Sequence, residues 1–130
     1  DKKMALNNAN NAQITRVALG AVAADTLFKV FQLLHSKKAI VKAFKVLDPT
    51  GVAAHASNTV KIQLKKGSTL LAEWDTTLTT GDGALVANTW AQAPETNIEV
   101  DGGDLDINVD VAASGALNAG AVAMIEWYYV

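Results

Sequence analysis

The chain has 130 residues, a formal net charge of −2 and no cysteine. This length suits one domain with its own core, and the lack of cysteine excludes disulfides, thiolate nucleophiles and thiolate-bound zinc. No apolar run reaches the roughly 18 residues of a membrane-spanning helix, so no membrane partner is expected. The small net charge hides a division, because all 11 basic residues lie within 1–66 and 10 of the 13 acidic residues lie within 67–130.

The first 13 residues, DKKMALNNANNAQ, are rich in asparagine and contain no aromatic residue. Such a segment cannot bury enough apolar surface for a core of its own. The composition therefore predicts a flexible or extended arm at 1–13, followed by one domain at 14–130. An arm of this kind gains packing when it lies on a neighbouring subunit and orders as it binds.

Residues 25–47, DTLFKVFQLLHSKKAIVKAFKVL, are open to two interpretations. Apolar residues at 27, 30, 31 and 34 fit helical spacing, and Asp25 could cap the helix. Alternatively, the segment forms two strand runs joined at His35–Lys38. We favour strands, because the rest of the chain has β-type patterning and a lone helix pair would require an α+β arrangement.

The middle of the chain predicts a hairpin. Residues 60–65, VKIQLK, alternate between apolar and polar residues, and TLLAEW at 69–74 follows a short connection at 66–68. Turn signals recur at Asp48–Gly51, Gly81–Gly83, Asp101–Gly103 and Asn118–Gly120. Short strands separated in this way are typical of a sandwich or barrel.

The segment 98–111, IEVDGGDLDINVDV, concentrates five carboxylates. Leu105, Ile107 and Val109 alternate with acidic or amide residues, which predicts a strand with one buried face, and Gly102-Gly103 suits a tight turn or a bulge. Calcium is the alternative interpretation. Side chains in a row along a strand do not converge, however, so a solvated face is favoured over an ion site at Asp101, Asp104, Asp106 and Asp110.

Residues 121–130, AVAMIEWYYV, are apolar on both faces of a predicted strand, which indicates a central strand or one lying against a partner. Trp74, Trp90 and Trp127 could form a sugar-stacking platform. Packing in a core or interface is favoured for them, since each ring buries a large area and needs one hydrogen bond.

The division of charge is best explained by topology. In a Greek-key sandwich, strands of the first half pair with strands of the second, which places lysine opposite aspartate. A second interpretation is that oppositely charged patches meet between subunits. Nucleic-acid binding is not expected, because the lysines are spread singly and lack interleaved arginine or aromatic residues.

Catalysis is not expected either. His35 and His55 fit surface or loop positions, no pair of carboxylates is marked as an acid and base, and no nucleotide or metalloprotease motif occurs. We therefore predict a protein that is not an enzyme and needs no cofactor. The expected fold is all-β, an antiparallel sandwich of jelly-roll type with about eight strands.

The stretches TRVALGAVAADTLFKV, AIVKAFKVLDPTGVAAHASNTVKIQL and GGDLDINVDVAASGALNAGAVAMIEWYYV together cover most of the chain. In this pattern a Gly-Asp turn opens a strand, a small-residue loop follows and an aromatic strand comes last. The chain resembles the decoration (cement) proteins of tailed-bacteriophage capsids, which have a β-sandwich or jelly-roll fold. No diagnostic motif accompanies the pattern.

This resemblance implies a structural virion protein on the capsid exterior, often a homotrimer, that binds the major capsid protein and bridges its subunits. The candidate contacts are the arm and the aromatic strand near residue 130. Their residues are Asn7, Asn8, Asn10, Asn11, Trp127, Tyr128 and Tyr129. A carbohydrate-binding or host-attachment β-sandwich module is the alternative.

Overall fold

A computed structural model describes residues 12–130, apart from the side chains at positions 35 and 36. The candidate residues Asn7, Asn8, Asn10 and Asn11 lie outside the described residues. The strands are β1 (Gln13–Ala18), β2 (Thr26–Leu47), β3 (Thr59–Lys66), β4 (Thr69–Asp75), β5 (Ala91–Gln92), β6 (Ile98–Ala112) and β7 (Val122–Tyr129). Every pairing between them is antiparallel. The prediction of an all-β antiparallel fold is confirmed, with seven named strands where about eight were expected.

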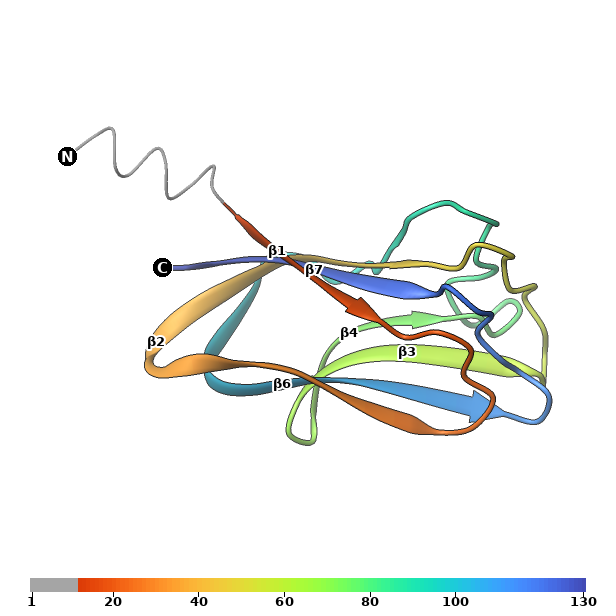
Figure 1. Cartoon of the computed structure of the whole chain (residues 1–130), viewed down its shortest axis with the longest axis horizontal. Helices are drawn as coiled ribbons and strands as arrows, with labels where there is room; N and C mark the ends of the chain where they lie inside the picture. The colour runs from red at the N-terminus through yellow and green to blue at the C-terminus, as the bar shows by residue number, and fades with distance from the viewer. Residues whose placement is uncertain (1–11) are drawn as a thin grey trace.

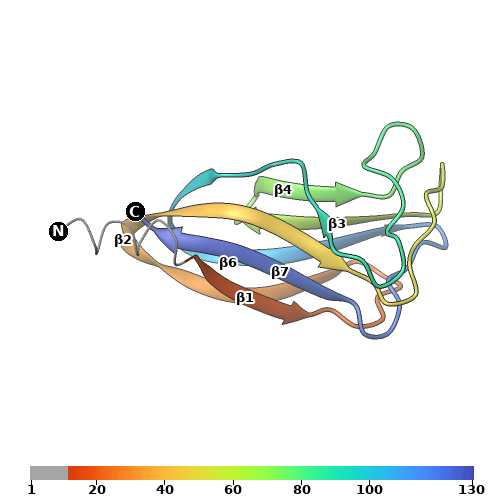
Figure 2. The same ribbon diagram turned by 90° about the horizontal axis from the view of Figure 1, so that it is seen from above.

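The strands form two layers (Figure 1 and Figure 2). The strand order is β1-β7-β2-β6-β3-β4, with β5 paired to β2. One layer contains β1, β7 and the second half of β2, and the other contains the first half of β2 with most of β6, β3 and β4. Most neighbours are far apart in sequence, as expected for a Greek-key sandwich.

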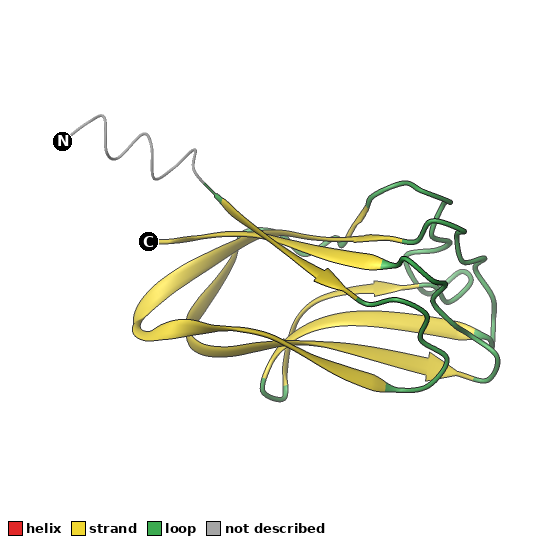
Figure 3. Ribbon diagram, in the orientation of Figure 1, coloured by secondary structure: helices red, strands yellow, loops and turns green. Residues whose placement is uncertain are grey.

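β2 and β6 belong to both layers, because they bend together at one end of the sandwich (Figure 3). Leu33 pairs with Gly103 and Lys38 with Asp101, so four residues of β2 lie opposite one residue of β6. Gly103 has φ +142°, a conformation that favours glycine. The strand interpretation of 25–47 is confirmed and the helix is wrong, but the two predicted runs form one continuous strand with a bulge in place of the expected connection at His35–Lys38. Of the two expectations for Gly102-Gly103, the bulge is confirmed and the tight turn is wrong.

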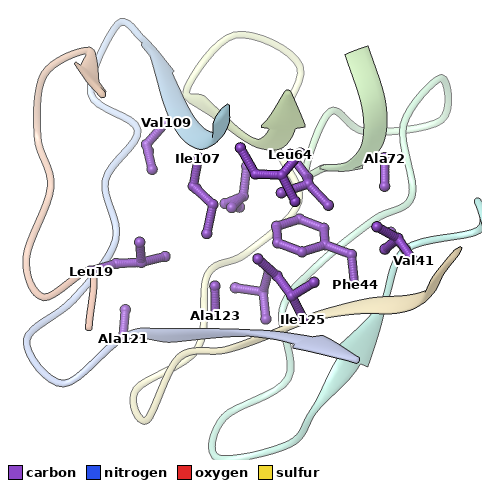
Figure 4. Close-up of a cluster of buried hydrophobic side chains, with 14 of the residues drawn as sticks. Leu19, Val41, Phe44, Leu64, Ala72, Ile107, Val109, Ala121, Ala123 and Ile125 are labelled. Atoms are coloured by element: carbon purple, nitrogen blue, oxygen red, sulfur yellow. The ribbon is translucent and has the colours of Figure 1, made fainter. Parts of the chain in front are cut away.

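The core lies between the layers (Figure 4). Phe44, Leu64, Ile107 and Ile125 are fully buried and come from four different strands. The alternation in 60–65 and 104–109 places these apolar side chains inward, as the sequence predicts. The predicted hairpin is also present, since Lys66 pairs with Thr69 across Gly67-Ser68.

Ion pairs follow the predicted topology. Lys29 pairs with Asp106, Lys38 with Glu99 and Lys45 with Glu126, at N–O distances of 3.3, 2.8 and 2.9 Å. Each pair joins a lysine of the first half of the chain to an acid of the second half. Such pairs contribute only about 0.2–1 kcal/mol when exposed, so their main effect is to favour one register.

Candidate functional site

The outer face of the β1–β7–β2 layer is mainly apolar. Side chains of directly paired residues lie on the same face of a sheet. Pairing therefore places the following residues together on this surface, here called the apolar face: Ile14, Arg16, Ala18, Ile40, Ala43, Lys45, Leu47, Val122, Met124, Glu126 and Tyr128. Its charged residues are few, and two of them, Lys45 and Glu126, pair with each other.

Part of the apolar face is accessible. Ile14 is 60% exposed, and Ile40, Leu47, Val122 and Tyr128 are half-buried. The guanidinium carbon of Arg16 lies 5.8 Å from the centre of the Trp90 ring, so the segment before β5 reaches across this layer to β1. A surface of this composition resembles the centre of a protein interface more than an ordinary solvated sheet.

The outer face of the other layer is polar. Three cross-strand rows run over β6, β3 and β4, and one of them is a chain of hydrogen bonds. Asn108 donates to Gln63 at 3.0 Å, and Gln63 donates to Glu73 at 2.6 Å. The neighbouring row contains Asp110, Lys61 and Asp75. This surface is called the polar face here, and its charged and amide side chains fit the predicted solvated face in 98–111.

Asp106 is the exception on the polar face. Its side chain is only 9% exposed, and Lys29, which is 74% exposed, reaches Oδ2 at 3.3 Å. Oδ1 is buried without a hydrogen-bond partner. The register places Asp106 between Lys29 of β2 and Lys65 of β3, which accounts for a buried carboxylate on an outward position. The alternation of the sequence did not distinguish it from its exposed neighbours Asp104 and Asp110.

The three aromatic candidates on β7 have different surroundings. Trp127 is 7% exposed, stacks on Phe31 with 4.9 Å between ring centres, and donates from Nε1 to Thr15 Oγ1 at 3.0 Å. Its ring is therefore core, and the expectation that it lies in a contact surface needs correction. Tyr129 meets Trp127 edge-on and its hydroxyl accepts the N–H of Leu34. Tyr128 lies on the apolar face and is the β7 candidate best placed for a partner.

The other tryptophans also fit the packing interpretation. Trp74 packs against the core and donates from Nε1 to the carbonyl of Gly83 at 3.1 Å. Trp90 is half-buried and lies beside Arg16. The three rings point to different parts of the domain and do not form one sugar-stacking platform.

An acidic cleft of about 310 Å³ lies beside the free edge of β4. Its carboxylates are Glu73, Asp75, Asp82 and Glu95. Each accepts a hydrogen bond from the protein: Glu95 from the N–H of Glu73, Asp82 from the N–H of Asp75, Asp75 from the N–H of Thr77, and Glu73 from the amide of Gln63. Over residues 12–130, no group of three or more histidines and carboxylates is arranged to hold a metal ion. The cleft is thus a set of capped loops and strand ends.

Asp48 is a buried carboxylate on which several hydrogen bonds converge, and the sequence did not reveal this role. Its Oδ1 accepts the N–H groups of Thr50 and Gly51 at 3.0 Å each, and Oδ2 accepts the N–H of Asn118 at 2.8 Å. The Asn118 amide adds a bond to Oδ1 at 3.1 Å. The sequence signal, Asp-Pro-Thr-Gly, predicts the local turn but not the link to a residue 70 positions away.

His55 fits the predicted loop position, whereas Lys38 lies within β2 and not in a connection between two strands. His55 is exposed in a loop, where Nδ1 accepts the N–H groups of Ser57 and Asn58 at 3.0 and 2.9 Å. Lys38 has a pKa raised above its usual value, first by its hydrogen bond to Glu99, then by the charges of Glu99 and Asp101.

In the part of the chain that the structure describes, no helix could cross a membrane.

No family model matches the chain, and no curated protein matches it. Solved structures with a similar fold include a chain of the cyanophage Pam1 capsid asymmetric unit, with a TM-score of 0.51, 18% identity, and coverage of 92% of this chain and 84% of that one. A capsid chain of Helicobacter pylori bacteriophage KHP30 has a TM-score of 0.47 at 13% identity, covering 91% and 94%.

A carbohydrate-binding module, CBM36 in complex with calcium and xylotriose, has a TM-score of 0.37 at 15% identity, covering 94% of this chain and 96% of that one. At these identities a likeness concerns the fold alone. Chains found in phage capsids and carbohydrate-binding modules are thus both among the structural neighbours, and the Pam1 chain shares the sandwich over most of its length.

Proposed function

We propose that this protein is a non-enzymatic structural virion component that binds the outer surface of a viral capsid and bridges its major capsid protein subunits. The observation that supports it most is the likeness in fold to a chain of the Pam1 capsid asymmetric unit over 92% of this chain. The sequence pattern resembles phage decoration proteins independently of that likeness.

The apolar face is the surface through which we propose binding. Tyr128, Val122 and Leu47 offer apolar area, while on the polar face Asn108, Gln63 and Glu73 are hydrogen-bonded to one another. A capsid repeats the same site many times, so one copy touching two subunits gains from effective concentration as well as from buried area. Modest contacts then suffice for stable attachment.

The carboxylates support a role without chemistry. A general acid or base needs a carboxyl group that is free to exchange a proton with a substrate. Asp75, Asp82 and Glu95 instead cap N–H groups of the protein. A glycan-binding role is not proposed, because Trp127 is buried and Trp74 packs against the core.

Cosedimentation with capsids of the virus that encodes the chain tests this proposal. Tyr128→Ser removes a ring from the apolar face and should weaken binding at least tenfold. The control is Asp110→Ala, which removes an exposed residue of the polar face and should leave binding unchanged. Equal binding by both variants would contradict the apolar face as the contact, and absence of binding by the unaltered protein would contradict the proposed function.

A further inference from the structure

The free edge of β1 has unused backbone hydrogen-bonding groups. The N–H of Leu19 donates to the carbonyl of Ala121, in register with the β1–β7 ladder. In an antiparallel ladder, alternate residues bond the neighbouring strand and the others point away from it. The N–H and C=O groups of Ile14, Arg16 and Ala18 therefore point outward, and no described residue bonds them.

Three other edges in the described part of the sheet are blocked. On β4, Glu95 and Asp82 cap the N–H groups of Glu73 and Asp75. β5 has two residues and is soon followed by Pro94. The first half of β2 has a register shift next to the exposed Lys29. Proteins commonly block edges in these ways to prevent strand pairing between chains.

β1 has no capping carboxylate, proline or register shift among its described residues. It is a regular strand of six residues, Gln13–Ala18, without proline or a register shift. Its one charged residue, Arg16, stacks near Trp90 and forms no ion pair among the described residues. An unblocked edge beside an apolar face is expected to pair with another strand.

We propose that β1 pairs with β1 of a second copy, antiparallel about a two-fold axis, so that the β1–β7–β2 layers join into one continuous sheet. A two-fold contact requires an edge that is complementary to itself. The outward N–H and C=O groups at alternate residues of β1 meet this requirement. Each copy supplies both donors and acceptors. The joined strands also bring Ile14 and Ala18 of both copies into one apolar surface.

Charge selects the register. In the joined ladder, residues whose backbone groups point outward must pair with each other. Two registers give the most overlap. One places Arg16 opposite Arg16 of the partner, and the other places it opposite Ile14 of the partner. Like charges directly opposite are destabilising, which disfavours the first. The second places Thr15 at the two-fold axis and forms about four backbone hydrogen bonds, two for each pairing of Ile14 with Arg16, whereas the first forms about six.

The favoured register also offers charge complementarity. Ile14 pairs within its own copy with Glu126 on β7, so this register aligns Arg16 of the partner with a cross-strand row that contains this carboxylate. The contact gives two copies, an alternative to the homotrimer that the resemblance implies. It concerns the isolated protein and holds or fails whether or not the chain binds a capsid.

Sedimentation equilibrium of the full chain tests the pairing. The expected result is a reversible dimer, which Arg16→Pro weakens at least tenfold because proline removes the outward N–H from both copies. Proline is tolerated on an edge strand where that N–H faces solvent. Arg16→Ala is the matched control: it removes the side chain, keeps the N–H, and should change the dimer dissociation constant by no more than about threefold, well below a lost charge-assisted bond.

A charge-swap pair tests the register even if the proline variant does not fold. Ile14→Glu should tighten the dimer, with an effect that salt reduces, and Ile14→Lys should weaken it, because position 14 faces the partner's Arg16. Amide exchange should show protection of Ile14 and Arg16 that increases with protein concentration. A monomer at all concentrations, a trimer, or a dimer insensitive to all four substitutions would overturn the proposal.

Discussion

Replacement of Asp48 should destabilise the fold more than replacement of any surface carboxylate. Asp48 is fully buried, and four hydrogen bonds from Thr50, Gly51 and Asn118 converge on its carboxylate. Net hydrogen bonds to a charged group contribute about 1.5–3 kcal/mol each, but water can reach some of the freed donors and the bonds are not additive. We therefore expect Asp48→Ala to lower the free energy of unfolding by about 3–5 kcal/mol.

Urea denaturation at 25 °C measures this loss, with an unchanged m-value indicating that the same transition is observed. Asn118→Ala removes the amide donor but keeps the backbone N–H, so it should cost about 1–2 kcal/mol. Asp110→Ala, on an exposed position of the polar face, should stay within about 0.5 kcal/mol. A loss below about 1 kcal/mol for Asp48→Ala would refute the view that this carboxylate holds the loops together.

Gly115→Ala should cost more stability than Gly67→Ala in the same urea assay, because a Cβ at 115 would overlap the Thr59 backbone, whereas at 67 the space is open and only the φ of +60° disfavours alanine. Equal losses would contradict this. The Lys38 amine should titrate above its ordinary pKa of 10.5 by NMR and return toward it in Glu99→Gln. Because the pKa of Lys38 is higher in the folded state, the contribution of the Lys38–Glu99 pair to stability is complete below the unfolded pKa and is lost as the pH rises through the folded pKa. An unshifted titration of Lys38 would show that the pair does not form in solution. Trp127→Ala should cost about 3–5 kcal/mol as a core truncation, and a loss under about 1 kcal/mol would place the ring outside the core.

The sequence predicts the strands where burial alternates. Residues 60–65 and 104–109 place one apolar side chain inward at every second position, and a period of two has one structural meaning. Residues 25–47 were harder, because β2 changes layer partway and its apolar residues change phase at the bend. A local pattern of this kind fits a helix as well as two strands.

Which residues lie together on the apolar face and on the polar face depends on pairing between distant segments. The sequence alone does not show this pairing. Tyr128 and Trp127 are neighbours in an aromatic run, but the alternation of β7 sends one to the apolar face and the other into the core. Asp106 and Asp110 look equivalent in the sequence. By register, only Asp106 of the two lies between lysines of both neighbouring strands, Lys29 and Lys65, and Lys29 forms an ion pair with it. The charge division predicted that such pairs exist, without naming the partners.

The bend shared by β2 and β6 has a mechanical consequence. Each strand is a single covalent chain that crosses from one layer to the other, so the layers cannot slide or peel apart unless the backbone at the corner is pulled out of both. Most strands also pair with segments that are far away in the sequence, and such long-range pairing makes folding slow. Unfolding of the sandwich should therefore occur in one cooperative step, and the shared corner should slow the separation of the two layers.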